Sequence, residues 1–187
     1  MDHLNQGLQA FQCSVSKDTL ASRRVEVAVV TFDSEVKVVQ EFVTPDQFQP
    51  PLLTAQGQTK MGSAILKALD MIRDRKAIYK ANGVVYYRPW VFMITDGAPQ
   101  GEPDEVVQQA ADRISEEESA KRVVFYAVGV EKADMEWLKT LVVRTPIKLI
   151  GLDFVSMFEW LSKSMEKVSQ SQTNEQVALP PAGWGTI

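Results

Sequence analysis

The chain has 187 residues, of which 45% are hydrophobic and 24% charged, and its formal net charge is -4. This length fits one domain with a substantial core, and the mildly acidic balance disfavours nucleic acid and anionic membranes as partners. The single Cys13 excludes an internal disulfide and a cysteine-built zinc site. No apolar run reaches the roughly 20 residues of a membrane span, so we expect a cytoplasmic protein.

The N-terminal part of the chain predicts a helix followed by a β-hairpin. Apolar residues recur at helical spacing over Leu4–Val15, and Asp2 is placed to cap the first turn. The stretches 24–32 and 35–43 are rich in β-branched residues, and only Asp33-Ser34 lies between them. This is hairpin spacing, so the two strands should be antiparallel neighbours.

The rest of the chain predicts helices and strands in alternation. Strand segments are nearly continuous in apolar residues, whereas helix segments repeat them every three or four positions. A helix carrying Ala64 to Ile72 should stop or bend at 81–83, where the sequence is Ala-Asn-Gly. The other expected elements are strands at 90–95, 122–130 and 147–152, and helices at 103–118, 133–142 and 154–168.

This alternation is typical of a parallel sheet covered by helices on both faces. We therefore expect a doubly wound, mostly parallel α/β fold with an antiparallel edge hairpin, in one domain over residues 1–168. The segment 169–187 is polar and contains Pro180-Pro181. It should be an extended, flexible tail unless Leu179 and Trp184 dock onto a surface.

A carboxylate stands at the end of one buried strand, in "VFMITDGAPQGEPDE" at 91–105. Ligands of open α/β sheets bind beyond the carboxyl ends of the strands, which is where Asp96 lies. The alternative is that Asp96 and Gly97 only form a turn, which both residue types favour for backbone reasons. The motif alone leaves both interpretations open.

A second stretch favours a functional role for this end of the sheet. The segment "GQTKMGSAI" at 57–65 places Thr59 between glycines at the start of a helix, where the backbone can approach a ligand. Thr59 and Asp96 would form a pair of oxygen ligands. Such a pair suits a hard divalent cation that keeps some of its water.

Four stretches together resemble the von Willebrand factor A (VWA) domain over about residues 4–168: "VAVVTFDSEV", "GQTKMGSAILKALDMI", "VFMITDGAPQGEP" and "VVFYAVGVEKADMEWLKTL". Among the branches of that family, the chain is most similar to the bacterial tellurium-resistance TerY type. Tails of that type also run into a proline-tryptophan segment like "ALPPAGWGTI". The resemblance implies phosphatase-like or kinase-like partners in a bacterial stress response.

The resemblance also implies a metal-ion-dependent adhesion site (MIDAS) for Mg²⁺ or Mn²⁺, built from three stretches. Its threonine is matched by Thr59 and its aspartate by Asp96. The third part, an Asp-x-Ser-x-Ser loop after a central first strand, is missing from this sequence. Asp33-Ser34-Glu35 cannot replace it, because it sits in a tight hairpin and lacks the serine spacing. A misassigned start, a cut chain and a true variant all remain open as explanations.

The function implied is a noncatalytic protein-interaction module that docks a partner at an incomplete metal site. Gly57, Met61, Gly97 and Asp33 would shape its rim, and two ligands alone should not bind Mg²⁺ or Mn²⁺ tightly. The rival interpretation is a metal-assisted phosphohydrolase, which needs a further carboxylate that only Asp33 could supply. A third treats the chain as a fragment whose contacts serve structure only.

The missing strand would lie between the strands at 24–32 and 90–95 in the family's sheet. Its absence would leave two ladders of buried backbone groups unpaired, at about 1 to 3 kcal/mol for each group. We therefore expect the two strands to pair directly, or a strand from another chain to fill the gap by exchange. The chain should be either less stable than a complete domain or associated with a partner.

Other polar and aromatic residues have simpler interpretations. His3 is the only histidine and is expected to be a solvated residue at the start of a helix, so no Ser-His-Asp system is indicated. Cys13 should pack as a small apolar residue on the first helix. Trp137 and Trp160 lie in apolar helical patterns and are expected in the core.

Overall fold

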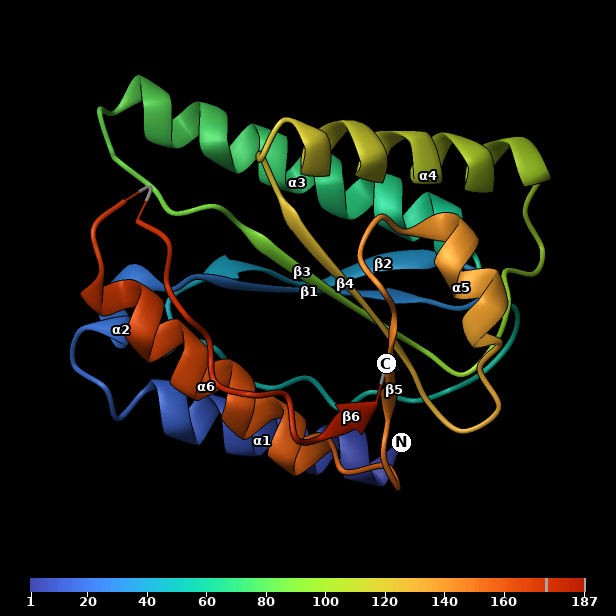
Figure 1. Cartoon of the computed structure of the whole chain (residues 1–187), viewed down its shortest axis with the longest axis horizontal. Helices are drawn as coiled ribbons and strands as arrows, with labels where there is room; N and C mark the ends of the chain where they lie inside the picture. Colours follow the sequence, from blue (N-terminus) through green and yellow to red (C-terminus); the bar gives the residue numbers. More distant parts are fainter. Residues whose placement is uncertain (174, 187) are drawn as a thin grey trace. The chain divides into compact units, whose positions relative to one another are not determined.

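The computed structural model describes residues 1–173 and 175–186, which divide into two compact units. The first unit contains residues 1–31, 37–55 and 149–186, and the second contains 32–36 and 56–148. Figure 1 shows helices and strands following one another along the whole chain, which is the expected α/β class.

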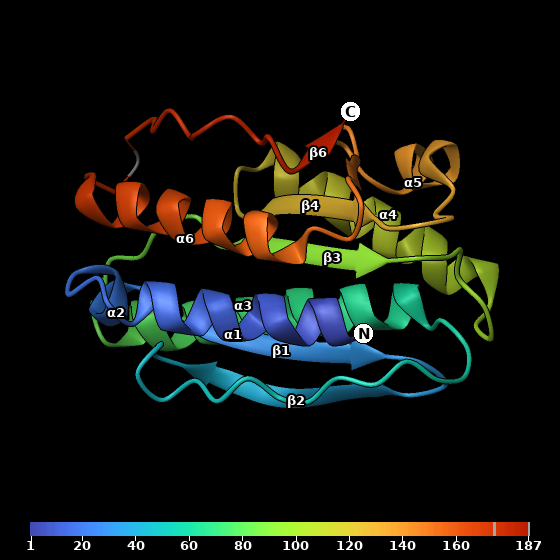
Figure 2. The same ribbon diagram turned by 90° about the horizontal axis from the view of Figure 1, so that it is seen from below.

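Two long helices form the body of the first unit. The helices α1 (Asp2–Val15) and α6 (Phe154–Gln170) lie side by side (Figure 2). Gly7 allows their close approach, because a Cβ at this position would lie 2.6 Å from the Phe158 ring and 2.9 Å from the Phe154 side chain. The rings of Phe11 and Phe158 complete the contact, with centroids 5.8 Å apart.

The expected hairpin is present, with a shorter first strand and a longer turn than predicted. Strand β1 (Val27–Phe32) is preceded by the short helix α2 (Ala21–Arg24), so the predicted strand start at residue 24 is wrong. Strand β2 (Val36–Val43) follows after residues 33–35. The two strands pair in a two-stranded sheet and run in opposite directions in Figure 2.

The second unit contains the alternating helices and strands that the sequence predicts. In chain order these are α3 (Met61–Ala81), β3 (Trp90–Thr95), α4 (Asp104–Ser119), β4 (Val124–Gly129), α5 (Met135–Leu141) and β5 (Ile147–Leu149). Strands β3 and β4 are parallel, with Trp90 opposite Val124 and Thr95 opposite Gly129, and β4 is parallel to β5. Helices α3 and α4 pack against each other (Figure 1).

Within the described chain the strands belong to two separate sheets. One holds β1 and β2, and the other has the order β3-β4-β5-β6, where β6 is Gly185–Thr186. Strand β4 has a neighbour on each side and is buried at five of its six positions, whereas β1 is half-buried throughout. The doubly wound order and the missing central strand stay predictions.

The C-terminal segment docks onto α6 through Trp184. The sequence predicts a flexible tail unless residues such as Trp184 dock onto a surface, and this docking is observed. Trp184 is only 3% exposed, and its ring meets the Trp160 ring at 5.7 Å. The Trp160 indole N–H donates to the Pro180 carbonyl at 2.7 Å, and the Ile150 N–H donates to the Trp184 carbonyl at 3.1 Å. These contacts lie within the first unit and hold the chain beside α6.

The strand predicted at 147–152 ends three residues early because a turn follows it. Gly151 and Leu152 have φ angles of 57° and 59°, in the left-handed region, and the Asp153 N–H donates to the Ile150 carbonyl at 3.0 Å. Asp153 then caps α6 by accepting from the Ser156 N–H at 3.0 Å. Hydrogen bonds from Ser156 lower the pKa of Asp153.

Three smaller predictions were wrong. Asp2 is the first residue of α1, whose cap residue is Met1, and no side chain caps this helix. Cys13 is exposed, so it does not pack in the core. Trp160 is buried as expected, but Trp137 is only half-buried. None of the helices in the described residues is long and apolar enough to cross a membrane.

Candidate functional site

Three loops of the second unit are joined by backbone hydrogen bonds. They are the hairpin tip at residues 33–35, the segment 56–60 before α3, and the segment 96–102 after β3, and we call them together the loop edge. The Lys60 N–H donates to the Asp33 carbonyl at 3.1 Å. This bond joins the hairpin tip to the segment that carries Thr59.

The second and third loops are joined through their backbones. The Thr59 N–H donates to the Gln100 carbonyl at 3.2 Å, and the Gln100 N–H donates to the Thr59 carbonyl at 2.9 Å. Thr59 is half-buried within this bridge. The segment that carries Thr59 and the segment that carries Asp96 are therefore joined by backbone hydrogen bonds.

Glycines allow this close approach of the loops. Gly57 has a φ of 75°, and a side chain there would collide with Ser34, whose hydroxyl accepts from the Gln58 N–H at 3.1 Å. Gly101 has a φ of 78° and faces the side chain of Gln58 in the same way. Gly57 therefore allows the close approach to the hairpin tip through its conformation and its lack of a side chain, and its role in a partner-binding rim stays a prediction.

Asp96 is the exposed carboxylate of the loop edge. The turn after β3 is made by its neighbour Thr95, whose hydroxyl donates to the Gly97 carbonyl at 3.0 Å and accepts from the Gly97 N–H at 3.3 Å. Thr95 is 5% exposed, whereas Asp96 faces solvent. No residue in the described part of the chain donates a hydrogen bond or forms an ion pair with the Asp96 carboxylate. The Thr95 side chain therefore makes the turn, and the Asp96 side chain takes no part in it.

Asp33 is occupied within its own hairpin. Its carboxylate accepts from the Glu35 N–H at 2.8 Å, and its own N–H donates to the Glu35 carbonyl at 3.0 Å. This is the arrangement by which aspartate stabilises a tight turn. Asp33 belongs to the rim through its backbone, and its carboxylate has a structural partner.

Met61 does not lie on the rim, so this prediction was wrong. Its side chain is fully buried at the start of α3. The next residue, Gly62, lies against α4: a Cβ there would be 2.9 Å from Val107 Cα and 3.0 Å from the Val106 carbonyl. Met61 therefore belongs to the core and offers no surface to a partner.

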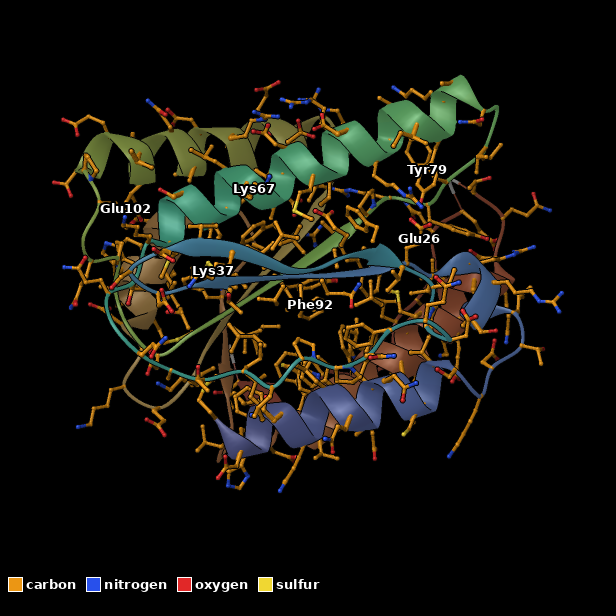
Figure 3. The ribbon with its side chains drawn as sticks, turned by 180° about the vertical axis from the view of Figure 1, so that it is seen from behind. Glu26, Lys37, Lys67, Tyr79, Phe92 and Glu102 are labelled. Carbon is orange, nitrogen blue, oxygen red and sulfur yellow. The ribbon has the colours of Figure 1, made fainter. Side chains whose placement is uncertain are left out.

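Glu102 is a carboxylate of the loop edge that the sequence did not single out, and it binds the start of α3. Its carboxylate accepts from the Gly62 N–H at 2.6 Å, and from the Ser63 N–H at 2.9 Å and the Ser63 hydroxyl at 2.8 Å. Figure 3 shows Glu102 beside the first turn of α3. It satisfies backbone donors that an anionic ligand would otherwise find free at a helix start.

One signal for such a residue was present in the sequence. The cap position of α3 is Lys60, which has no acceptor side chain and makes no capping hydrogen bond. A buried helix start needs an acceptor from elsewhere when its own cap residue provides none. The pattern indicates that a partner exists, although it does not say which residue it is.

The donors on the loop edge do not fit a divalent cation. Asp33 Oδ1 accepts from the Glu35 N–H, and both oxygens of Glu102 accept from the start of α3, so these two carboxylates already have partners within the chain. Among the described residues, no group of three or more histidine, cysteine, aspartate or glutamate side chains is placed to hold a metal ion. Mg²⁺ and Mn²⁺ prefer several oxygen ligands, and the residues of the loop edge do not provide such a set.

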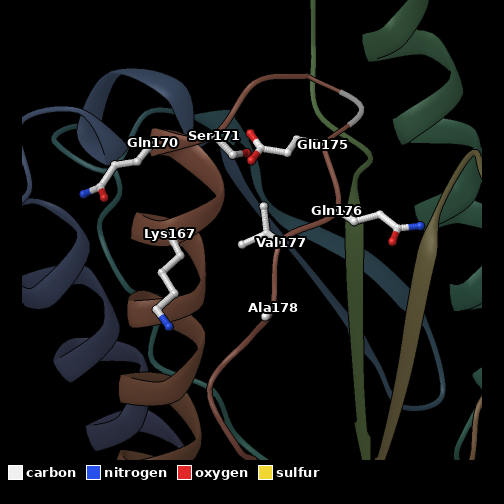
Figure 4. Close-up of a pocket in the computed structure, with 7 residues that line it drawn as sticks. All are labelled: Lys167, Gln170, Ser171, Glu175, Gln176, Val177 and Ala178. Carbon is white, nitrogen blue, oxygen red and sulfur yellow. The ribbon is translucent and has the colours of Figure 1, made fainter.

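A hollow lies in the first unit, at the end of α6 (Figure 4). It contains none of the residues predicted for a site, and its lining is mostly polar and lies on α6 and the chain after it. The lining residues are Lys167, Gln170, Ser171, Glu175, Gln176, Val177 and Ala178. We assign it no role in the function proposed below.

One comparison with known protein families gives a match that covers the loop edge. The family model described as the von Willebrand factor type A domain matches residues 2–147, which is most of the chain and includes all three loops. No curated protein matches the chain closely enough to count as a relative. Domains of this family commonly mediate protein–protein interactions. The chain therefore belongs to the von Willebrand factor type A domain family.

Proposed function

We propose that this chain is a noncatalytic protein-interaction module that docks a partner on its loop edge. The observation that carries the proposal is the contrast between Asp96 and its surroundings. The Thr95–Gly97 turn and the Thr59–Gln100 bridge hold the loop on which Asp96 lies, while the Asp96 carboxylate is exposed and unpaired among the described residues. A rigid loop that presents a free acceptor is well suited to recognition.

The chemistry of the loop edge supports binding more than catalysis. A general base or nucleophile needs a second group within hydrogen-bond reach to activate or orient it. In the part of the chain that the structure describes, Asp96 has no such neighbour, and Asp33 and Glu102 are committed to backbone groups. We therefore propose that the chain is not an enzyme.

The free carboxylate also limits the partner's chemistry at that point. An ionised aspartate only accepts hydrogen bonds, so the partner should present a donor there, such as an arginine, a lysine or a backbone N–H. In a metal-loaded family site the partner would instead supply an acidic ligand. The donor set of this chain favours the direct contact.

The setting proposed for this contact rests on the resemblance to the tellurium-resistance branch. We propose a cytoplasmic role in a bacterial stress response such as tellurite resistance. Phosphatase-like or kinase-like proteins are the proposed partners. The loop edge would then position such a protein without acting on it chemically.

Photo-crosslinking tests the proposal directly. A photoreactive amino acid replaces Ala98, an exposed residue of the loop edge, and in a matched variant it replaces Lys163, which is exposed on α6. We expect a discrete protein adduct from position 98 in cells, lost on adding Asp96→Ala, and no equivalent adduct from position 163. Identical adducts from both positions, or an adduct insensitive to Asp96→Ala, would contradict a docking role for the loop edge.

A further inference from the structure

The C-terminal end of α3 carries a sequence with its own chemistry. Asn82-Gly83 is the only Asn-Gly pair in the chain. In such a pair the glycine N–H group can attack the asparagine side chain, because glycine has no Cβ to hinder the approach. Both residues are exposed at the end of α3.

The local structure keeps the two reacting groups apart. The Gly83 N–H donates to the Lys80 carbonyl at 3.2 Å, and the Asn82 side-chain amide donates to the Ile78 carbonyl at 2.8 Å. The Val84 N–H donates to the Tyr79 carbonyl at 2.8 Å, and Gly83 has a φ of 65°. These are the bonds and the left-handed glycine of a Schellman cap.

The backbone angle of Asn82 is unsuitable for the reaction. Its ψ is 9°, which turns the Gly83 nitrogen toward the Asn82 backbone nitrogen and away from the Asn82 side chain. Only rotation about the soft φ and ψ bonds can bring the two together. That rotation breaks the cap, and helix ends open more easily than helix centres.

We propose that Asn82 is a site of spontaneous deamidation whose rate is set by local opening of the α3 cap. When the cap opens, the Gly83 nitrogen bonds to Asn82 Cγ, the bond from Cγ to Nδ2 breaks, and ammonia leaves with the proton of the Gly83 amide. Water then opens the cyclic imide at either carbonyl and yields aspartate or isoaspartate. One water is consumed and one ammonia released, with no change in oxidation state.

The product weakens the cap that restrained its formation. The new carboxylate has lost the donor that bound the Ile78 carbonyl, and it puts negative charge at a helix C-terminus, where the dipole disfavours it. The isoaspartate product also adds a backbone atom, which changes the spacing of the cap's hydrogen bonds. Modified chains should therefore fray at residues 79–84 while the core elements stay intact.

The experiment compares the folded chain with a synthetic peptide covering residues 80–86, both kept in mildly alkaline buffer. Peptide mapping by mass spectrometry follows conversion at Asn82, and Asn5, whose side chain exchanges hydrogen bonds with the Leu53 backbone, is the internal control. We expect the folded chain to convert more slowly than the peptide. The factor should equal the exchange protection of the Gly83 and Val84 amides.

Two variants test separately the deamidation of Asn82 and the control of its rate by opening of the α3 cap. Asn82→Gln should stop conversion on this time scale, because its imide ring is larger and closes more slowly. Val84→Pro removes the N–H that bonds the Tyr79 carbonyl, so conversion should approach the peptide rate. Conversion of the native chain at the peptide rate would show that the α3 cap does not limit deamidation. No conversion at Asn82 after the longer time that the peptide rate and the measured exchange protection together predict would overturn the site itself.

Discussion

Glu102 holds the first turn of α3 through Ser63, a residue 39 positions earlier in the chain. One carboxylate oxygen of Glu102 accepts from both the Ser63 backbone N–H, at 2.9 Å, and the Ser63 hydroxyl, at 2.8 Å. The other accepts from the Gly62 N–H at 2.6 Å. Because Glu102 closes the segment 96–102, this one side chain fixes the loop after β3 to the helix that follows Thr59.

Replacing Glu102 should loosen this junction. We expect Glu102→Ala to lower the free energy of unfolding by about 1 to 2 kcal/mol, the usual cost of losing a helix cap, with Glu102→Gln intermediate. Chemical denaturation measures the change, and amide exchange at Gly62 and Ser63 locates it. Glu105→Ala is the control, because Glu105 is exposed in the first turn of α4. Equal effects of the two alanine variants would argue against the cap.

A buried carboxylate at the opposite end of β4 should matter more for stability. Glu118, with a side chain 6% exposed, accepts from Arg88 at 3.0 Å, from Arg144 at 3.0 Å and from the Phe125 N–H at 2.6 Å. Its removal leaves two cations and a buried amide without their acceptor. We expect Glu118→Ala to destabilise the chain by about 3 to 5 kcal/mol.

The control for this prediction is a neighbour in sequence that lies in solvent. Glu116 pairs with Arg122, but its side chain is 66% exposed. An exposed pair of this kind contributes about 0 to 1 kcal/mol, so Glu116→Ala should change the denaturation midpoint little. If Glu118→Ala were as mild as Glu116→Ala, the buried network would not carry the stability assigned to it.

Metal binding by the loop edge should be weak. Asp96 is its one uncommitted carboxylate among the described residues, and one charged ligand competes poorly with the hydration shell of Mg²⁺ or Mn²⁺. Titration calorimetry with either ion should give only weak heats, and these should be the same in the wild type, Asp96→Ala and Thr59→Ala. A tight site that disappears in Asp96→Ala would show that the donor set is larger than the described contacts indicate.

The strand edges predict association. In the described chain, β1 pairs only with β2 and β3 only with β4, although both are runs of apolar residues typical of strands with two neighbours. An open apolar edge invites another strand. Sedimentation velocity should show species larger than the monomer, growing with concentration. A strictly monomeric sample with a cooperative melt at high temperature would contradict this.

The sequence was sufficient to predict an element where the residues of that one segment determine its bounds. The apolar run at 90–95 ends in turn residues on both sides, and β3 has these bounds. Gly83 likewise ended α3 where expected, because a left-handed residue after a helix nearly requires glycine. Thr59 and Asp96 lie on loops that a backbone bridge joins, but Thr59 follows β2 of the other sheet, so the rule that parallel strands share one carboxyl edge does not explain their placement.

The sequence was insufficient where a contact depends on the path of the chain. Nothing near Glu102 indicates that it turns back to cap α3, and the polar tail gives no period that would predict the burial of Trp184. The end of β5 was missed for a different reason. Leu152 is apolar and reads as strand, yet it adopts a left-handed φ of 59° beside Gly151. The apolar side chain of Leu152 thus indicates a strand, whereas its backbone conformation is that of a turn.

The affinity of the crosslinked partner for purified variants shows whether the partner binds through the Asp96 carboxylate. We expect Asp96→Ala to weaken binding at least as much as the loss of a charge-assisted hydrogen bond, about 1.5 to 3 kcal/mol or roughly tenfold or more. Asp74→Ala, which removes another exposed carboxylate, in the middle of α3, should leave the affinity unchanged. Equal affinities of the wild type and Asp96→Ala would contradict docking through Asp96.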